Sequence, residues 1–367
     1  MRKLLLVRPF ANVMNIQSYN SQEIGLCKAF CKYGYDCDIV YFSTVNRSEQ
    51  VFCNGKNKVT LIWKKGITIG TMAIFPQYLN PIRLKTYDII ISNEYNQIMS
   101  IFLTLLHRNV YIYHGPYFNT FEMDIQMKVY DWINVPICNG FVKGIFAKTD
   151  DAAQFLRDKG LKNVSCVGVG LDIEKFEKRQ FDFLYTFRKN NILYVGTDEP
   201  RKRIGYIMKV FQALCEKKKE VHLTIVSNID RNRKNQLMKM VSPQYRKNIE
   251  FLEKVNNTMM ADIYGNAMCS VLASDVEIFG MVVLESMYFG VPCIAHAVAG
   301  PKTVIDDQIN GILEKNYDIE RWAADIEYLI NNSEIRNQMG NEAKRKVLHH
   351  FTWDKIAYKM MKKMKER

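Results

Sequence analysis

The sequence has no apolar run that approaches the roughly twenty residues needed for a membrane-spanning helix. Its first residues, MRKLLLVRPF, contain too short an apolar run for a signal peptide. The nine cysteines are scattered and never spaced as C-x-x-C, which argues against structural zinc and against a disulfide framework. Such cysteines are typical of reduced thiols that pack as small apolar side chains in a cytosolic protein. We therefore expect a cytoplasmic location.

The sequence also has fewer acidic than basic residues. The 367-residue chain has 51 lysines and arginines against 38 aspartates and glutamates, which gives a net charge of +13. Such an excess suits nucleic acid, an anionic membrane surface or a phosphorylated substrate, and charge alone does not choose among them. The basic residues are dispersed, however, and no helix-turn-helix, zinc or RNA-binding signature accompanies them. Nucleic acid is therefore not an expected partner.

The chain is long for a single core and suits two domains. Short β-rich apolar runs alternate with helical patterns, which predicts parallel sheets with helices on both faces. In the first half the predicted strands are residues 4–7, 37–42, 87–92, 110–113, 145–147 and 164–167. In the second half one strand begins at residue 191, and others are residues 222–226, 249–252, 270–273 and 291–295. The boundary is expected near residues 170–190.

The first helix has recognisable ends in the sequence. Asn20 with Glu23 resembles a capping box, and the predicted helix runs to Tyr33 before Gly34. Its helical period predicts one buried face, made of Ile24, Cys27, Phe30 and Cys31.

The segment EIFGMVVLE is the most informative part of the chain. Glu277 and Glu285 bracket it, and a helix is predicted to begin near Gly280 and to stop at Gly290 and Pro292. The first amides of that helix face any anion placed before it, and a diphosphate fits there. An ionised Glu285 is able to accept two hydrogen bonds from a vicinal diol such as ribose. The two glutamates alone are equally compatible with a surface residue and a capping residue.

The longer context of this segment resembles a known family. ILYVGTDEPRKR and the stretch from IEFLEKVNN to DDQINGIL are similar to retaining GT-B glycosyltransferases of the group 1 type, in the same order. The string DEPRK resembles the bacterial phosphatidylinositol mannosyltransferases, and the C-terminal half as a whole also resembles polysaccharide-assembly enzymes. The resemblance implies an α/β protein of the GT-B fold, with two Rossmann-like, doubly wound domains that face each other across a cleft.

Two further segments resemble the family at its domain boundaries. VGVGLDIEKF is similar to the segment that closes the first domain, and FTWDKIAYKMMKKM to the last helix. The implied domains are an acceptor-side domain at residues 1–170, a nucleotide-sugar domain at residues 171–349 and a helix at residues 350–367 that crosses back to the first domain. A hinge at the linker would close the cleft and exclude water.

The resemblance implies catalytic roles for His114, Lys202 and Glu277. Lys202 matches the lysine that neutralises the donor diphosphate and stabilises the leaving group. His114, in YIYHGPY just beyond a strand end, matches the histidine beside the donor sugar. Glu277 matches a ligand of that sugar. Other donor-binding residues implied by the resemblance are Gly196, Thr197, Arg201, Arg203, Val255, Phe279, Gly280, Met281, Val282 and Glu285.

The sequence departs from the family in two places. Thr197 follows Gly196 where the family usually has arginine. Either Arg201 or Arg203 supplies the second positive charge, or the site binds phosphate more weakly. The first loop, PFANVMNIQSYNSQE, lacks the glycine pair that many relatives place against the phosphate. The candidates to replace it are Asn15, Gln17 and Ser18.

The implied reaction is transfer of a hexosyl group from a nucleotide diphosphate sugar to a hydroxyl, with retention of configuration. The leaving diphosphate helps to deprotonate the acceptor on the same face of the sugar, and neither a metal nor another cofactor is expected. A UDP-sugar is preferred over a GDP-sugar as donor, and a glycan or lipid-linked precursor of a surface polysaccharide is the expected acceptor. The alternatives are a non-catalytic nucleotide-sugar-binding module and a GT-B nucleotide-sugar epimerase.

One basic segment suggests peripheral contact with the cytoplasmic face of a membrane. In residues 62–85, IWKKGITIGTMAIFPQYLNPIRLK, the aromatic residues Trp63, Phe75 and Tyr78 are interspersed with lysines and arginines, which suits the headgroup layer of an anionic membrane. An ordinary exposed loop with buried aromatic residues is the competing interpretation.

Overall fold

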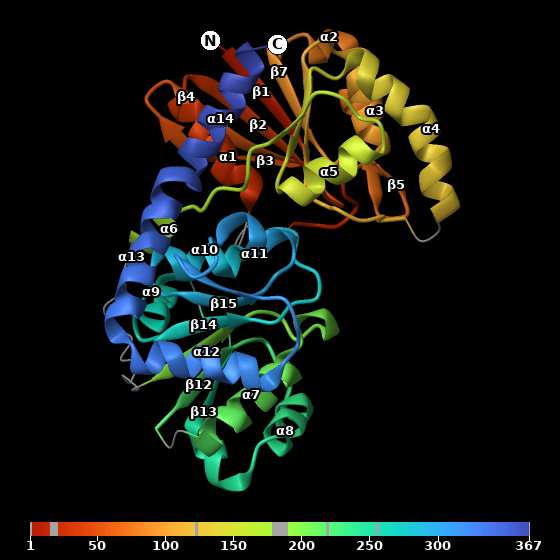
Figure 1. The fold of residues 1–367 in the computed structure, drawn as a ribbon. Helices are drawn as coiled ribbons and strands as arrows, with labels where there is room; N and C mark the ends of the chain where they lie inside the picture. The colour runs from red at the N-terminus through yellow and green to blue at the C-terminus, as the bar shows by residue number, and fades with distance from the viewer. Residues whose placement is uncertain are drawn as a thin grey trace. The chain divides into compact units, whose positions relative to one another are not determined.

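The computed structural model describes residues 2–14, 21–121, 124–177, 190–217, 220–253, 255 and 257–366. The chain divides into two compact units; in Figure 1 the first is coloured from red to yellow-green, with its last helix in dark blue, and the second from green to blue. Unit 1 consists of residues 1–170 together with residues 352–367, and unit 2 of residues 171–351. The last helix therefore belongs to the first unit.

Unit 1 is built on an eight-stranded sheet with the order β10-β9-β8-β7-β1-β2-β4-β3. Every neighbouring pair is parallel except β3 with β4, which is antiparallel at the edge. The strands that follow β1 along the chain are first added on one side of it, beginning with β2, and later on the other side, beginning with β7. The strand order therefore reverses between β1 and β7, which is the switch point of this sheet. The strands are β1 (Arg2–Val7), β2 (Tyr35–Phe42), β3 (Arg47–Asn54), β4 (Asn57–Lys64), β7 (Ile89–Asn93), β8 (Val110–His114), β9 (Gly144–Ala147) and β10 (Val164–Cys166). A separate hairpin pairs β5 (Ile67–Ile69) with β6 (Met72–Ile74).

Helices cover both faces of this sheet (Figure 1). They are α1 (Gln22–Lys32), the 3-10 helix η1 (Pro76–Tyr78), α2 (Pro81–Leu84), α3 (Ile98–Leu106), α4 (Asp124–Phe141), α5 (Asp150–Asp158) and α14 (Trp353–Lys365). The last of these, α14, packs against α1. A Cβ atom at Gly25 or at Gly170 would overlap the Trp353 side chain, so glycine at both positions lets the final helix close onto the unit.

Unit 2 is built on a fully parallel six-stranded sheet with the order β13-β12-β11-β14-β15-β16. In chain order this is the Rossmann arrangement 3-2-1-4-5-6, whose ligands bind outside the carboxyl ends of the two central strands. Those strands are β11 (Asn191–Val195) and β14 (Cys269–Leu272). The others are β12 (His222–Val226), β13 (Ile249–Leu252), β15 (Cys293–His296) and β16 (Gly311–Glu314).

The helices of unit 2 enclose its largest apolar core. They are α6 (Glu174–Glu177), η2 (Pro200–Lys202), α7 (Ile204–Lys217), α8 (Arg231–Lys239), η3 (Pro243–Asn248), α9 (Asn257–Gly265), α10 (Met281–Tyr288), α11 (Ala299–Val304), α12 (Ile319–Asn331) and α13 (Ser333–His350). On one face of the sheet, α7 and α12 pack together over buried strand residues such as Ile192 and Leu223. This core fixes the two strands whose ends carry the candidate site.

The predicted strands are confirmed as strands, with shifted ends in places. The predicted capping box rests on Asn20, which lies outside the described residues. Helix α1 begins at Gln22, and its N-cap is Ser21. The Glu23 carboxylate accepts hydrogen bonds from Asn93 Nδ2 at 2.7 Å and from the Tyr41 hydroxyl at 3.4 Å. Glu23 therefore joins α1 to the sheet.

The aromatic residues of segment 62–85 do not lie at the surface. Trp63, Phe75 and Tyr78 are each 0% exposed, because they pack into the core of unit 1. The interpretation of these three as headgroup-layer aromatics is therefore wrong, and the competing interpretation of buried aromatics holds. Within the described part of the chain, no helix is both long and apolar enough to span a bilayer.

Candidate functional site

The candidate site of unit 2 lies where β11 and β14 end. Lys202 closes η2, which follows β11, and Glu277 lies in the loop that follows β14. The Lys202 ammonium forms an ion pair with Glu277 Oε2. Lys202 is only 7% exposed, so the pair is largely withdrawn from water. Burying this ion pair costs the desolvation of both charges. An anionic ligand at the switch point would therefore replace the Glu277 carboxylate as the partner of Lys202.

The loop that carries Lys202 is held by backbone hydrogen bonds. The Gly196 amide donates to Val226 O at 3.1 Å, and the Asp275 amide donates to Arg201 O at 2.8 Å, which ties the two strand-end loops together. Arg203 then adopts a left-handed conformation with φ of 50°, which is uncommon for a residue with a side chain. Such strain persists only where the surroundings fix it, and it is concentrated at functional sites.

The structure separates the two arginines proposed to replace the missing family arginine. Arg201 donates to Val276 O at 2.9 Å, and its guanidinium lies 3.9 Å from Glu277 Oε2, beside Lys202. Arg203 instead donates to Asp275 Oδ1 at 2.5 Å and stacks over the Tyr317 ring at 4.1 Å. Of the two, Arg201 therefore lies with the Lys202–Glu277 pair.

Thr197 does not contribute charge to this loop. Its hydroxyl donates to Glu199 Oε1 at 2.6 Å, and Arg201 Nε donates to the other oxygen at 2.7 Å. These two hydrogen bonds lower the pKa of Glu199. Glu199 thus remains an anion that holds Arg201 in place.

The helix predicted after Glu277 is confirmed. Gly280 is the N-cap of α10 with φ of 78°, a left-handed conformation that favours glycine. The amides of Met281 and Val282 open the helix, and no earlier turn supplies acceptors for them. Phe279, immediately before, is 2% exposed. The positive end of α10 therefore begins three residues beyond Glu277, next to the ion pair.

The loop of residues 277–280 packs closely against α11 at Gly300. The Gly300 amide donates to Glu277 O at 3.0 Å. A Cβ at Gly300 would lie 2.5 Å from the Phe279 carbonyl carbon and 2.7 Å from its oxygen, which is closer than such atoms approach.

We expect Gly300→Ala to weaken nucleotide binding, because the new methyl group must push the 277–280 loop away from its present position. The expected loss of affinity is about tenfold or more, from misplacing the helix amides and Glu277. Gly265→Ala is the matched control, since a Cβ there meets nothing within 4 Å. Calorimetric titration of both variants with nucleoside diphosphate checks this, and equal affinities for the two would contradict it.

Glu285 is held differently from the expected ionised residue. It is 1% exposed on α10 and accepts a hydrogen bond from the Tyr264 hydroxyl at 3.1 Å. Burial raises the pKa of this carboxyl well above its usual value. The protonated form is therefore favoured in the free protein, whereas the sequence predicted an ionised carboxylate.

Glu285→Gln is expected to stabilise the fold at alkaline pH. A carboxyl whose folded pKa is raised contributes its full stability below the unfolded value of about 4.3 and loses it as the pH rises. Glutamine keeps an acceptor for Tyr264 without that loss, so the gain in the free energy of unfolding should grow from pH 5 to pH 8. Thermal unfolding across this range measures it. A gain that does not change with pH would show that burial does not penalise the charged form.

Unit 1 carries a second set of polar residues at its strand ends. His114 is the last residue of β8, and Glu94 directly follows β7. His114 is 1% exposed, and its Nδ1 atom forms an ion pair with Glu94 Oε2. The edge of the Tyr95 ring lies against the imidazole at 5.0 Å between centroids, and Phe155 stacks on it at 6.4 Å. Among the described residues, neither ring nitrogen of His114 has a hydrogen bond, although Nδ1 lies against Glu94 Oε2 and Nε2 has no polar contact of this kind.

Glu94 is a functional candidate that the sequence interpretation missed. It has φ of 64°, and its two carboxylate oxygens lie 3.3 and 3.2 Å from the Gly115 amide that donates to them. Burial alone would raise its pKa, but His114 and Lys148, with the Gly115 hydrogen bond, lower it below the usual value. The carboxylate therefore orients the ring of His114 and leaves Nε2 available. The one signal in the sequence is an acidic residue directly after a buried strand.

A polar cluster surrounds the β1–β7 switch point of unit 1. Arg8 Nε lies 3.6 Å from Glu23 Oε1, the same oxygen that Asn93 bonds. The side-chain carbonyl oxygens of Asn93, Asn96 and Gln97 are buried without a partner within the described residues. Buried polar atoms are normally satisfied, so this cluster suits a hydroxyl-rich ligand. The candidates Asn15, Gln17 and Ser18 lie outside the described residues.

Val255 is the remaining predicted donor residue. It is half-buried in the connection between β13 and α9. It lies in unit 2, as do the other residues predicted to bind the donor, whereas His114 lies in unit 1.

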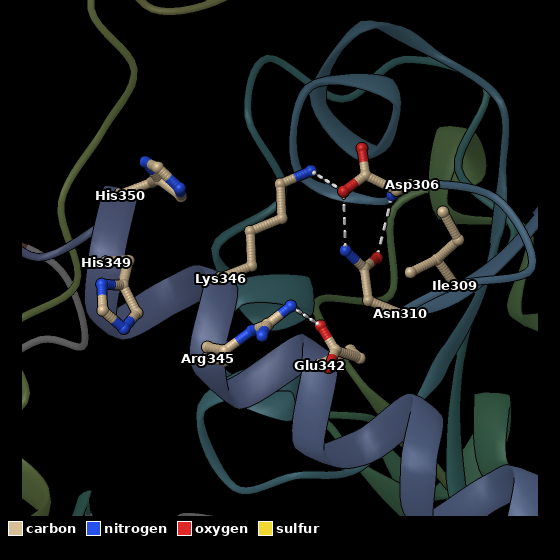
Figure 2. A pocket seen from close by; sticks show the side chains of 8 residues that line it. All are labelled: Asp306, Ile309, Asn310, Glu342, Arg345, Lys346, His349 and His350. Carbon is tan, nitrogen blue, oxygen red and sulfur yellow. Dashed lines mark hydrogen bonds and ion pairs between the residues drawn. The ribbon is translucent and has the colours of Figure 1, made fainter.

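A separate hollow of unit 2 lies beside the C-terminal part of α13 (Figure 2). Lys346 Nζ lies 2.8 Å from Asp306 Oδ2, Asn310 Nδ2 donates to the same oxygen at 3.1 Å, and Arg345 pairs with Glu342. Its lining is Asp306, Ile309, Asn310, Glu342, Arg345, Lys346, His349 and His350. Since none of the predicted site residues is in this lining and its charges are paired, we do not assign the donor to it.

The two doubly wound sheets, with polar residues at their carboxyl ends, define an α/β protein with two Rossmann-like units. Residues 176–346 match the family Glycosyl transferases group 1. An uncharacterized glycosyltransferase of Methanocaldococcus jannaschii is 29% identical over 168 residues, which cover 45% of this chain and 42% of that protein. A D-inositol 3-phosphate glycosyltransferase of Salinispora arenicola is 26% identical over 174 residues, covering 45% and 39%. The matched part thus spans about two fifths of the length of these relatives.

Solved structures resemble the whole chain. HepE from Anabaena, in complex with UDP, has a TM-score of 0.72 at 13% identity and covers 100% of both chains. A glycosyltransferase from Rickettsia africae has a TM-score of 0.74 at 15% identity and covers 100% of this chain and 98% of its own. TarM from S. aureus, in a complex that includes UDP, has a TM-score of 0.68 at 14% identity, with 99% and 100% covered. The predicted GT-B fold is therefore confirmed.

Proposed function

We propose that this chain is a retaining glycosyltransferase that moves a hexosyl group from a nucleotide diphosphate sugar to a hydroxyl acceptor. The observation that carries the proposal is the Lys202–Glu277 ion pair, at the switch point of unit 2 and next to the N-terminus of α10. The match of residues 176–346 to Glycosyl transferases group 1 supports the same reaction class.

The donor diphosphate would exchange with the ion pair. Its oxygens accept from Lys202, Arg201 and the amides that open α10, and this releases the Glu277 carboxylate for hydroxyls of the sugar. As the bond between the anomeric carbon and the phosphate oxygen breaks, negative charge builds on the departing diphosphate, and Lys202 stabilises it most at that moment. Glu285 accepts from the ribose hydroxyls, and Val255 contacts the base through its main chain.

The acceptor hydroxyl attacks from the face that the diphosphate leaves. The new bond forms between the acceptor oxygen and the anomeric carbon, and the hydroxyl proton passes to a phosphate oxygen of the leaving group. His114 Nε2 contacts the hexosyl group, and Glu94 holds its ring. No covalent intermediate, bound metal or other cofactor is required in this scheme, because protein cations and amides do the electrostatic work.

Donor and acceptor classes complete the proposal. A UDP-sugar is the preferred donor, since the HepE and TarM structures contain UDP. The acceptor is a glycan or a lipid-linked precursor of a surface polysaccharide, taken at the cytoplasmic face of a membrane. The unpartnered amide oxygens of Asn93, Asn96 and Gln97 suit the hydroxyl groups of such an acceptor.

Nucleotide-dependent thermal stabilisation tests the donor class. We expect UDP and a UDP-sugar to raise the unfolding temperature of the wild type more than GDP or ADP do, and expect the increase to be smaller for Glu285→Ala. A product assay with the same donors then separates the alternatives. Binding without turnover would favour a non-catalytic module, and a free sugar released or epimerised without acceptor would favour an epimerase. No stabilisation by any nucleotide at millimolar concentration would overturn the proposed site.

A further inference from the structure

Helix α4 of unit 1 has an apolar face that no described part of the chain covers. Trp132 is 80% exposed, the highest exposure of any large apolar side chain recorded, and Ile125, Val129 and Ile133 are 66%, 56% and 50% exposed. Phe141, at the end of the helix, is 57% exposed. With 3.6 residues per turn, Ile125, Val129, Trp132 and Ile133 lie on one face of the helix, whereas Phe141 lies nearer to the side that packs inward. We call Ile125, Val129, Trp132 and Ile133 the α4 stripe.

The core does not explain the stripe. The opposite side of α4 already packs inward through Met127, Asn134 and Cys138, and Asn134 donates to Tyr95 O at 2.8 Å. Because α4 is apolar on its exposed side as well as on its buried side, its exposed side is expected to pack against another molecule. Contiguous exposed apolar residues of this kind mark interaction sites.

Two helices near α4 carry further exposed apolar residues. Helix α3 packs against α4, and Figure 1 shows α2, α3 and α4 along the same side of unit 1, in orange to yellow. Ile82 on α2 and Leu105 on α3 are 78% and 51% exposed. The exposed cations Arg83, Lys85, Arg108 and Lys128 lie in or next to these helices.

We propose that the α4 stripe docks unit 1 onto an anionic lipid bilayer, with Trp132 at the level of the headgroups. Tryptophan prefers the membrane interface, and neighbouring lysines and arginines are attracted to anionic lipids. A second copy of this chain is a poorer occupant, because each copy has a net charge of +13 and the two repel. The proposal deepens the membrane-side acceptor proposed above, but it depends on this surface alone.

The tryptophans provide a built-in probe. Trp63 and Trp322 are 0% exposed and Trp353 is 6% exposed, so Trp132 alone of the four faces solvent. When vesicles of phosphatidylcholine and phosphatidylglycerol are added to the full chain, its emission should shift to the blue, and lipids brominated on the acyl chain should quench it. Pure phosphatidylcholine vesicles should bind more weakly, and salt should reduce binding to the anionic vesicles.

Substitutions locate the surface. Val129→Glu and Ile133→Glu should each weaken co-sedimentation with anionic vesicles by about tenfold or more, since each places a buried charge at the contact. Ile309→Glu is the matched control, because Ile309 is 58% exposed but lies in unit 2, and it should bind like the wild type apart from the added charge.

Four outcomes would overturn the proposal. These are no vesicle binding by the wild type, equal losses for Ile309→Glu and the α4 variants, binding without a shift of Trp132 emission, and wild-type self-association that Val129→Glu abolishes. The last would assign the stripe to a second copy. Because vesicle binding is measured without donor and nucleotide binding without vesicles, failure here leaves the proposed activity intact, and the reverse also holds.

Discussion

Lys202→Ala is expected to lower donor turnover by about 10²–10³-fold, the largest effect of any single substitution in unit 2. Lys202 is buried, and its partner Glu277 lies at the end of the neighbouring central strand, so its charge faces the position proposed for the diphosphate. Removing it takes away a cation that acts mainly as charge develops on the leaving group. The loss in kcat is measured as the rate at which nucleoside diphosphate is released from the sugar donor, with the donor at saturating concentration.

Two further variants make the Lys202 result specific. Lys217→Ala removes a lysine that pairs with Glu320 at 2.6 Å on an exposed surface, and it should leave turnover unchanged. In Lys202→Ala the Glu277 carboxylate keeps, among the described residues, only the more distant Arg201, at 3.9 Å. Combining Glu277→Gln with Lys202→Ala removes this poorly compensated charge, so it should recover stability without recovering turnover. If turnover in Lys202→Ala matched that of Lys217→Ala, the ion pair would be structural and the proposed role of Lys202 wrong.

The second large effect is expected at the His114–Glu94 pair. His114→Ala should reduce kcat by about 10²-fold and Glu94→Gln by about tenfold or more, with little change in nucleotide affinity, because the residues proposed to bind the nucleotide belong to unit 2. Glutamine keeps the size of the side chain but removes the charge that orients the imidazole. The measurement is kcat against KM for each variant, and His107→Ala, a half-buried histidine of the same unit bonded to Tyr87 O at 3.0 Å, serves as control.

The same pair predicts a pH dependence of stability. The lowered pKa of Glu94 means that its ionised form contributes stability above the unfolded value of about 4.3, and that this stability is lost as the pH falls through the folded pKa. The free energy of unfolding of Glu94→Gln should therefore be lower than that of the wild type at pH 7, and the difference should shrink in acid. A difference that is constant with pH would mean that charge is not what holds His114.

The unit 2 residues Lys202 and Glu277 were predicted from the resemblance of their segments to a known family. The structure gives the physical reason that they meet. The apolar run ILYVG ends in Gly196, CSVLA is followed by Ser274, and the Rossmann order places the two strands side by side. Lys202 and Glu277 therefore form an ion pair although they are separated by 75 residues. The helix after Gly280 was equally predictable, since its apolar run and its glycine stop are local signals.

The residues of unit 1 that escaped prediction depend on contacts that are not local. Glu94 meets His114 only because β7 pairs with β8 and because Glu94 adopts a left-handed backbone conformation. Strand β3 was missed because RSEQVFCN is mostly exposed and lacks a clear alternation of apolar residues. The aromatic residues of segment 62–85 illustrate the opposite error, because composition does not reveal which side of a strand or turn faces the core.

The α4 stripe shows a related limit. The sequence DIQMKVYDWINVPICNGF has apolar residues on all sides, and no periodicity distinguishes those that face inward from those that face solvent. Only the placement of Met127 and Cys138 in the core reveals that Trp132 is directed away from it. The docking surface is therefore proposed from the fold, whereas the donor site was predicted from sequence motifs.

Isothermal titration of the wild type and Lys202→Ala with UDP and with uridine tests the central claim most directly, which is that the strand-end site of unit 2 binds a nucleoside diphosphate through Lys202. We predict that the substitution weakens UDP binding by about tenfold to a hundredfold, as for a hydrogen-bonded charge, and leaves the weaker binding of uridine unchanged. Equal effects on both ligands, or no effect on UDP, would contradict the account, because the lysine would then not contact the diphosphate.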